Sequence, residues 1–308
     1  MEKTIKPVNV GQIEAYLNTA GIPFMVEGDR ETSVIGFSSL SHYRDNTVTW
    51  INAKKTDIEL PKDISICVVQ EGVEIQAEAK IISPNSKATF FSILERFWGT
   101  GEEENEPAIG EGSVIGPNVR LGENVKIGCN CSIRGEIYIG DGTTIGDNVV
   151  IRNRVEIGRN CTIQSLVAIG EDGYGYREDE GHIKTMNKHF GGVVIEDDVF
   201  IGGHTNITRG TIDDTVIKKG TKIAQTTLIA HNDYIGENVA IVCAQLFGSV
   251  TVGDNAYVSS SIIRNQSKIG SGSIVGMGSV VTQDVEDHKV VMGLPAKVVR
   301  DSRQQGKL

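Results

Sequence analysis

One aliphatic residue recurs at every sixth position through the middle of the chain. The uninterrupted series is Ile109, Ile115, Leu121, Ile127, Ile133, Ile139, Ile145, Ile151, Ile157, Ile163 and Ile169. In such a hexapeptide the aliphatic side chain points inward, while glycine or asparagine supplies the tight turn. Three hexapeptides, about 18 residues, close one triangular coil, and stacked coils bury a continuous aliphatic column. The pattern predicts a mainly β fold, a left-handed parallel β-helix, which departs from the right-handed crossover rule.

A long segment interrupts this repeat. Residues 171–192 have no period of six, which returns at Ile195 and breaks again at 208–214. A solenoid does not need such an insertion for packing, and inserted loops often form a binding face. We therefore predict a β-helix over 106–285 with an inserted loop at 171–192.

Residues 1–105 lack the repeat and predict a small α/β domain. VGQIEAYLNTAG is typical of a short helix that ends at Gly21. Residues 86–98 have the spacing of an amphipathic helix, capped by Asn85 or Ser86. The runs SVIGFSSL, TVTWINA, ISICVVQ and AKIIS indicate strands, and the acidic GTGEEENEP indicates a linker.

Composition agrees with tightly turned β structure, because the chain has 36 glycines and only 6% aromatic residues. A net charge of −10 argues against nucleic-acid binding. No apolar run has the length of a membrane span, and the first residues lack the apolar core of a signal peptide. We expect a cytoplasmic protein. The final segment, 286–308, is expected to leave the helix as a basic tail.

The cysteines do not indicate a metal site. Cys131 and Cys161 fall at inward positions of the repeat, where they are expected to act as small core residues. Cys129 and Cys131 are separated by one residue, which lacks the gap of a zinc knuckle. We predict no bound metal and no bound cofactor.

Three longer motifs carry more information than the period alone. They are IQSLVAIGEDGYGYREDEG (163–181), ITRGTIDDTVI (207–217) and IAHNDYIGEN (229–238). With the order of a small domain, a hexapeptide helix, an insertion and then a histidine, they resemble the UDP-3-O-acylglucosamine N-acyltransferase family over residues 10 to 285. The resemblance implies a homotrimer and a lipid A-like or surface-polysaccharide pathway.

The resemblance also implies roles for individual residues. His231, in IAHN, takes the place of the catalytic base, and His189, near the end of the insertion, is assigned to substrate binding. Trp50 and Asn52 take the place of residues that hold uracil, although the tyrosine that completes that site has no counterpart. Gln266 replaces a second histidine, and we assign it to acyl-donor binding.

The end of the chain resembles a different group. Residues 276–300, GMGSVVTQDVEDHKVVMGLPAKVVR, are similar to the ending of coenzyme-A-dependent hexapeptide acetyltransferases. That resemblance implies that Lys297 and Arg300 meet a phosphate of the acyl donor. The donor is therefore expected to be an acyl carrier protein thioester or a coenzyme A thioester.

Acyl transfer to an amine needs a base, donors for the oxyanion and aligned substrates. His231 follows the inward Ile229 by two residues, which places it at a coil corner, pointing outward; histidine suits proton removal at neutral pH. The backbone N–H of Gly248 is the predicted oxyanion donor, since glycine permits close approach. Asp213, about one coil before His231, or Asp214 is predicted to orient the imidazole.

The substrate-binding set also includes Asn232, Tyr174 and Tyr176, the two tyrosines being expected to pack the insertion rather than to react. We predict an N-acyltransferase that moves an acyl group from a thioester to the amine of a nucleotide-linked amino sugar. One alternative is a short-chain, acetyl-CoA-dependent amino-sugar acetyltransferase. A non-catalytic solenoid that binds or scaffolds is another. A zinc-dependent carbonic anhydrase of the same fold is disfavoured, because no histidines have the H-x-x-x-x-H spacing.

Overall fold

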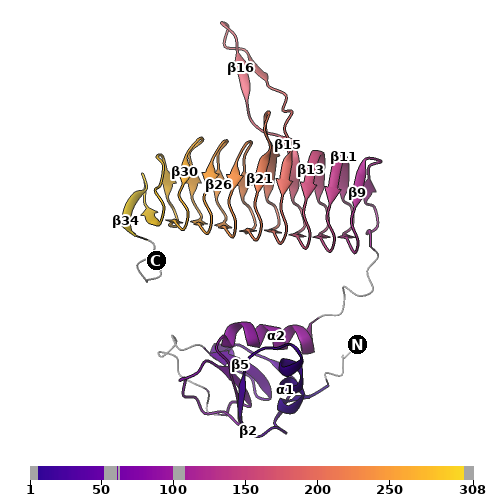
Figure 1. Cartoon of the computed structure of the whole chain (residues 1–308), viewed down its shortest axis with the longest axis vertical. Coiled ribbons are helices and arrows are strands. Elements are labelled where there is room, and N and C mark those ends of the chain that lie inside the picture. Colours follow the sequence, from indigo (N-terminus) through magenta and orange to yellow (C-terminus); the bar gives the residue numbers. More distant parts are fainter. Residues whose placement is uncertain (1–5, 52–60, 62, 100–107, 302–308) are drawn as a thin grey trace. The chain divides into compact units, whose positions relative to one another are not determined.

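The computed structural model describes residues 6–51, 61, 63–99 and 108–301. The chain forms two compact units, Met1–Asn105 and Glu106–Leu308 (Figure 1).

The first unit is a small mixed sheet with two helices. Its five-stranded sheet has the order β2-β7-β6-β5-β4, in which only β2 and β7 pair antiparallel. The elements are β1 (Val8–Asn9), α1 (Val10–Thr19), β2 (Met25–Gly28), β3 (Ser33–Val34), β4 (Gly36–Phe37), a 3-10 turn (Leu40–His42), β5 (Thr47–Ile51), β6 (Ile66–Val69), β7 (Ala79–Ile82) and α2 (Ser86–Trp98).

Both predicted helices of this unit are confirmed, and local side chains explain where they begin. Asn9 accepts the Gln12 N–H at 2.9 Å and the Gln12 side chain accepts the Asn9 N–H at 2.9 Å, which is a reciprocal cap. The side chain of Asn85 caps α2 by accepting the Ala88 N–H. The buried face of α2 packs against β5 and β6.

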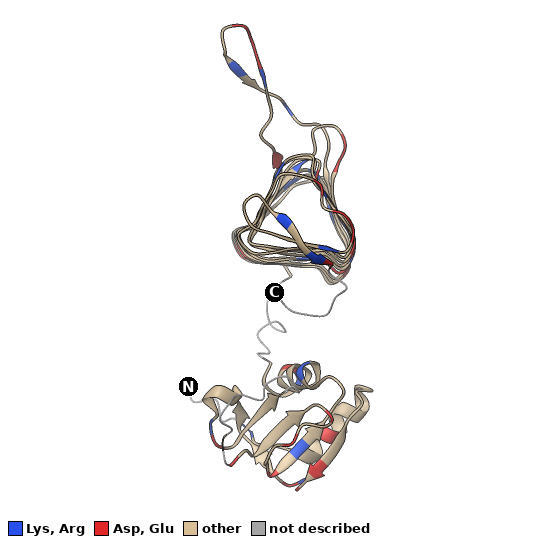
Figure 2. Cartoon of the chain, turned by 90° about the vertical axis from the view of Figure 1, so that its left-hand side faces the viewer, with Lys and Arg blue, Asp and Glu red and all other residues tan. Residues whose placement is uncertain are grey.

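The second unit is the predicted left-handed parallel β-helix, which is triangular when viewed along its axis (Figure 2). One face is a single sheet, formed by β10 (Lys126–Ile127), β12 (Thr144–Ile145), β14 (Thr162–Ile163), β19 (Phe200–Ile201), β22 (Lys222–Ile223), β25 (Ala240–Val242), β28 (Tyr257–Ser259), β31 (Ile274–Val275), β33 (Lys289–Met292) and β34 (Lys297–Asp301).

The other two faces are continuous through the long strands β11 (Ser132–Ile139) and β13 (Val150–Ile157), which pass around a corner. The second face holds β8 (Val114–Ile115), β15 (Ala168–Asp172), β20 (Asn206–Arg209), β23 (Leu228–Ile229), β26 (Gln245–Leu246), β29 (Ile262–Ile263) and β32 (Val280–Val281). The third holds β9 (Val119–Leu121), β18 (Val193–Ile195), β21 (Thr215–Ile217), β24 (Tyr234–Ile235), β27 (Thr251–Val252) and β30 (Lys268–Ile269).

The repeat explains the core of this unit. Parallel pairing stacks equivalent isoleucines, such as Ile133 on Ile151 and Ile151 on Ile169, and all three are fully buried. Cys131 and Cys161 lie in the same core, 1% exposed, as predicted. The aliphatic column is therefore what holds the coils in register.

The insertion leaves one corner of the triangle and forms a projecting hairpin (Figures 1 and 2). Its two strands, β16 (Tyr176–Glu178) and β17 (Lys184–Met186), pair antiparallel, and both are exposed.

The end of the chain differs from the expectation of a tail that leaves the helix. Strand β33 pairs parallel with β31 as a further rung, and β34 folds back antiparallel onto β33. The run VVM continues the inward pattern, so Val290 and Val291 are buried rather than exposed. Lys297 and Arg300 therefore lie on a strand that ends the β-helix.

In the part of the chain that the structure describes, no helix is long and apolar enough to cross a membrane. Nor do three histidine, cysteine or carboxylate side chains among those residues group as ligands for a metal ion.

Candidate active site

The predicted site residues gather at the corner from which the insertion leaves. In the coils that follow, Asn232, Ser249 and Gln266 occupy equivalent turn positions, each with φ between 62° and 66°. The register places them above one another, because Tyr234 pairs with Thr251 and Thr251 with Lys268. One residue earlier in each turn, His231 lies beside Gly248.

His231 is half-buried, and its ring has a defined orientation. Its Nδ1 lies 3.1 Å from the side-chain oxygen of Asn232. Because an amide oxygen only accepts, this contact places the proton on Nδ1 and leaves the lone pair on Nε2. Nε2 has no hydrogen-bond partner among the described residues, so it is available to take a proton.

The amide of Asn232 is oriented by three groups. Its Nδ2 donates to the carbonyl oxygen of Asp213 at 3.0 Å, and its Oδ1 accepts from the Thr211 N–H at 3.1 Å and the Thr211 hydroxyl at 2.8 Å. If the amide were flipped, its NH₂ group would face the two Thr211 donors and its oxygen would face the Asp213 carbonyl oxygen. These bonds therefore select the orientation that turns the oxygen toward His231.

Gly248 packs directly against the imidazole. A Cβ on Gly248 would lie 2.5 Å from Cε1 and 2.6 Å from Nε2 of His231, closer than real contacts allow. Its backbone N–H donates to no group among the described residues, whereas the neighbouring Ser249 N–H is bound to the His231 carbonyl oxygen. Among the described residues, Gly248 thus has an unpaired N–H and packs against the base.

His189 is buried behind this pair, 1% exposed. Its ring meets that of His231 edge to face, with centroids 5.4 Å apart. Its Nδ1 lies 3.0 Å from the Gly173 nitrogen, which donates, and 3.2 Å from the Arg209 carbonyl oxygen, which accepts, so these two contacts favour opposite tautomers. Its Nε2 is buried without a partner among the described residues. His189 thus supports the imidazole of His231, and its predicted contact with substrate stays a prediction.

The two ends of the insertion are tied together beneath the hairpin. Arg209, 8% exposed, donates from Nε to the Gly191 carbonyl oxygen at 2.6 Å and lies 3.9 Å from the carboxylate of Asp172. The His189 N–H points to the same carboxylate at 3.4 Å. The insertion is therefore anchored at its base, next to His231, although its tip projects into solvent.

A pocket of about 620 Å³ opens at this corner. It is lined by Asp172, Gly173, Tyr174, Thr208, Leu228, Ala230, His231, Phe247, Gly248, Ser249, Asn265 and Gln266. The structure thus brings together the predicted base, the predicted oxyanion donor, Gln266 and one of the two tyrosines. Leu228 and Phe247 give one wall an apolar surface.

Other predicted residues lie elsewhere. Tyr176 is on the hairpin, with its ring 5.7 Å from that of Tyr174, as expected for packing within the insertion. Trp50 is half-buried in the first unit, where its ring is 6.3 Å from that of Phe90, and Asn52 lies outside the described residues. Neither Lys297 nor Arg300 lines the pocket.

The predicted contact between the Asp213 carboxylate and the imidazole is wrong. His231 is bound instead to Asn232, which Asp213 holds through its backbone carbonyl. The carboxylate of Asp214 is turned to the other side, where it meets the guanidinium of Arg154 and the Gly192 N–H. The reason is coil length, since Ile207 pairs with Ile229, 22 residues on, and the extra residues bulge out of the turn.

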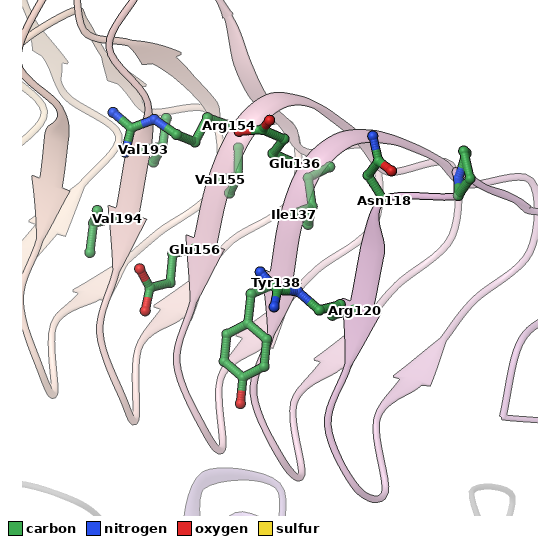
Figure 3. A pocket seen from close by; sticks show the side chains of 11 residues that line it. Asn118, Arg120, Glu136, Ile137, Tyr138, Arg154, Val155, Glu156, Val193 and Val194 are labelled. Carbon is green, nitrogen blue, oxygen red and sulfur yellow. The ribbon is translucent and has the colours of Figure 1, made fainter.

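Arg154 also lines a second hollow, of about 640 Å³, which extends from the coils before the insertion to Val193 and Val194 on β18, just after it (Figure 3). Arg120, Glu136, Tyr138 and Glu156 project into it from β9, β11 and β13. The hollow contains none of the predicted catalytic residues, and its charges are balanced, so it is not the candidate site.

One residue at the site was missed at the sequence level. Asp233 is fully buried, in a position that the repeat reserves for small or branched residues. Burial raises the pKa of Asp233 well above its ordinary value of 3.8, and the backbone N–H groups of Val250 and Ala230 lower it by less. An aspartate at an inward position of the six-residue period can be noticed in the sequence, because carboxylates are seldom fully buried.

Known protein families match parts of the chain. The model described as bacterial transferase hexapeptide (six repeats) matches residues 136–171, and the model described as GMPPB C-terminal domain matches residues 209–307. The UDP-3-O-acylglucosamine N-acyltransferase of Methylorubrum extorquens (strain PA1) is 40% identical over 134 residues, 42% of this chain and 38% of that protein. That of Campylobacter lari is 33% identical over 134 residues, 43% of this chain and 42% of that protein.

These matches span less than half the length of the relatives, and over that part they confirm the resemblance inferred from the motifs. Among solved structures, LpxA from Acinetobacter baumannii has a TM-score of 0.56 at 27% identity, covering 63% of this chain and 74% of its own. The UDP-N-acetylglucosamine acyltransferase from Francisella novicida has a TM-score of 0.55 at 25% identity, covering 60% and 67%. The likeness confirms the predicted fold class.

Proposed function

We propose that this chain, a hexapeptide-repeat protein related in sequence to acyltransferases, moves an acyl group from a thioester to the amine of a nucleotide-linked amino sugar. One observation carries the proposal. Among the described residues, His231 presents an unpaired Nε2, oriented through Asn232, and packs against Gly248, whose N–H is also unpaired, at the wall of a pocket. A base and an oxyanion donor side by side are what acyl transfer requires.

In the proposed reaction the amine nitrogen attacks the thioester carbonyl carbon, and a C–N bond forms. Nε2 of His231 takes a proton from the nitrogen, while the Gly248 N–H donates to the oxyanion. The tetrahedral intermediate collapses by breaking the C–S bond, and the imidazolium returns its proton to the departing sulfur. The products are an amide and a free thiol, so protons and bonds balance.

The proposed acyl donor lies along the coils beyond His231. Leu228 and Phe247 line that side of the pocket and offer apolar surface to an acyl chain, and Gln266 supplies a polar group near the thioester. Both an acyl carrier protein and coenzyme A present the thioester on a flexible arm. The two donors are therefore distinguished by experiment rather than by the pocket.

The acceptor, in this proposal, approaches from the insertion, where Tyr174 is 74% exposed at the rim of the pocket. An aromatic ring of this kind suits contact with a sugar or a base. We further propose a cytoplasmic homotrimer in which a neighbouring copy covers the open side of the site.

A thiol-release assay tests the function. Purified protein is incubated with UDP-linked and dTDP-linked amino sugars, each against acetyl-CoA and against acyl carrier protein thioesters. We expect thiol release only when both substrates are present. Replacing His231 with alanine is expected to reduce the rate on the order of 100- to 10,000-fold, because general base catalysis is lost.

Three outcomes would contradict parts of the proposal. Full activity of His231→Ala would remove the mechanism. Release with coenzyme A thioesters alone would assign the donor to the short-chain alternative. Binding of a nucleotide sugar without thiol release from any donor would favour the non-catalytic solenoid.

A further inference from the structure

Asp233 stands out within an otherwise uncharged inward column. The register of the third face aligns Val193, Thr215, Asp233, Val250 and Ser267 on successive coils. All five side chains are at most 1% exposed. An isolated buried carboxylate is costly, and a valine would satisfy the packing at this level, as it does at two others. The fold alone does not explain why the chain keeps an aspartate there.

The carboxylate connects two turns that the proposed reaction needs. One oxygen accepts the Ala230 N–H at 2.9 Å and so closes the turn that contains His231 and Asn232. The other accepts the Val250 N–H at 2.8 Å, on the coil that carries Gly248. Because each oxygen binds a different coil, the distance between the two turns depends on this side chain.

We propose that Asp233 is a positioning residue that sets the spacing between the base, His231, and the oxyanion donor, Gly248. It touches neither substrate and acts through the backbone of the two turns. The spacing has little tolerance, since an added Cβ on Gly248 would lie 2.5 Å from the His231 ring. A small separation of the turns would misalign the N–H and the imidazole, and errors of about 1 Å at such sites cost as much as 100-fold in rate.

The alternative is that Asp233 only joins coils, and other side chains show how the fold does that. Thr221, also fully buried, donates from its hydroxyl to the Gly236 carbonyl oxygen at 2.8 Å and accepts the Val239 N–H at 3.0 Å. This bridge is made at a different corner, away from the pocket. Thr221 is therefore the matched control for a bridge with no positioning role.

The test replaces Asp233 with valine and Thr221 with valine in the full chain. For Asp233→Val we expect a urea midpoint close to that of the parent, because removal of the buried carboxylate offsets the loss of its bonds to the Ala230 and Val250 N–H groups. We expect its kcat to fall about 10- to 100-fold, with KM for both substrates within about twofold. For Thr221→Val we expect the opposite: a lower urea midpoint and a parental kcat. Asp233→Asn, which keeps one of the two acceptors, is expected to have an intermediate kcat.

A second measurement does not depend on activity. Amide hydrogen exchange of the Ser249 N–H is expected to be faster in Asp233→Val than in the parent, because its bond to the His231 carbonyl oxygen opens with the turns, whereas the Val250 N–H loses its acceptor directly and is not used. A parental kcat in Asp233→Val would overturn the inference. So would kcat losses of equal size in Asp233→Val and Thr221→Val, because these would indicate a general structural effect.

The kinetic part rests on the proposed function, and the two can fail separately. If the parent releases no thiol with any substrate pair, the proposed function fails and hydrogen exchange alone decides. Unchanged exchange of the Ser249 N–H in Asp233→Val would then overturn the spacing role, and faster exchange of that N–H would support it.

Discussion

The regular corners of the β-helix and the corner at His231 join their coils in different ways. At regular corners, Thr143 and Thr221 each use one hydroxyl to donate to a carbonyl oxygen of the next coil and to accept an N–H from it. At the His231 corner, Asp233 has two acceptor oxygens on two N–H groups. The hydroxyl bridge satisfies both kinds of backbone group, whereas the carboxylate satisfies only donors.

The difference shows that the corner at His231 is less favourable for stability than the regular corners. The turn beside His231 leaves the Gly248 N–H without a partner among the described residues, and it buries a carboxylate where a hydroxyl or a methyl group would fit. The buried carboxylate lowers stability, since burying a charged group is costly. Departures of this kind from the local rule are expected where a fold carries function. The following changes test whether the two corners differ as this comparison implies.

The largest effect is expected from Gly248→Ala. The added methyl group would collide with the His231 ring, so the base must move away from the N–H beside it. We expect kcat to fall about 100- to 1,000-fold, with a small change in stability, because the φ of Gly248 is one that alanine adopts readily.

Gly36→Ala is the control for this change, since no atom lies within 4 Å of a Cβ at Gly36. Its activity should match that of the parent. If Gly248→Ala keeps more than half of the parental kcat, the close packing of turn and imidazole is not needed for the reaction.

A smaller effect is expected from Asn232→Ala, which removes the oxygen that accepts from Nδ1 of His231. Without it the imidazole is free to change tautomer or orientation. We expect kcat to fall about 10- to 100-fold, the scale seen when an orienting partner is lost. Steady-state kinetics with both substrates measures it.

Asn238→Ala serves as its control. Asn238 also occupies the left-handed region, with φ of 52° against 64° for Asn232, so alanine pays a similar backbone cost at both positions. Equal losses of activity in the two variants would show that the backbone, and not the bond to His231, explains the effect.

Thr143→Val is expected to change stability without changing catalysis. The substitution removes a bridge and leaves the Gly158 carbonyl oxygen and the Cys161 N–H without that partner. We expect the free energy of unfolding to fall by about 1–3 kcal/mol, measured by urea denaturation. A loss of kcat of more than about twofold would mean that the regular corners are coupled to the site, and the comparison would fail.

Much of the difference between the two kinds of corner can be predicted from the sequence, and what cannot be predicted has a physical reason. The six-residue period identified the buried column, and its phase placed His231 at a corner, because both depend only on local spacing. Asp213 was misassigned because its coil is 22 residues long, as the pairing of Ile207 with Ile229 shows. Pattern alone does not reveal whether a bulged turn presents a carboxylate or a carbonyl.

The hydrogen-bond partners of Asp233 could not be predicted from the sequence for a related reason. They depend on which coil lies above it, and here the step from Asp233 to Val250 is 17 residues, from the register of Tyr234 with Thr251. The orientation of the Asn232 amide likewise depends on Thr211 and Asp213, which lie in the bulged turn. Such contacts follow from the exact path of the backbone rather than from residue type.

The smallest expected effect is a change with pH in the difference between the free energies of unfolding of the parent and Asp233→Asn. Burial raises the pKa of Asp233 in the folded protein above its ordinary value of 3.8. The folded state therefore holds this proton more tightly than the unfolded state, and the resulting stability is complete below the ordinary pKa and is lost as pH rises through the folded pKa. Asp233→Asn does not titrate at this position. As pH is raised from about 4, the parent should lose stability relative to Asp233→Asn. Urea denaturation of both proteins at each pH measures the difference, because the contributions of their other ionisable groups cancel.

The Thr143 bridge carries no ionisable group, so the difference in stability between the parent and Thr143→Val should stay constant over the same range. If instead the parent becomes more stable relative to Asp233→Asn as pH rises, the bonds from the two N–H groups affect the pKa of Asp233 more than burial does. The carboxylate is then a stabilising bridge like those of the regular corners.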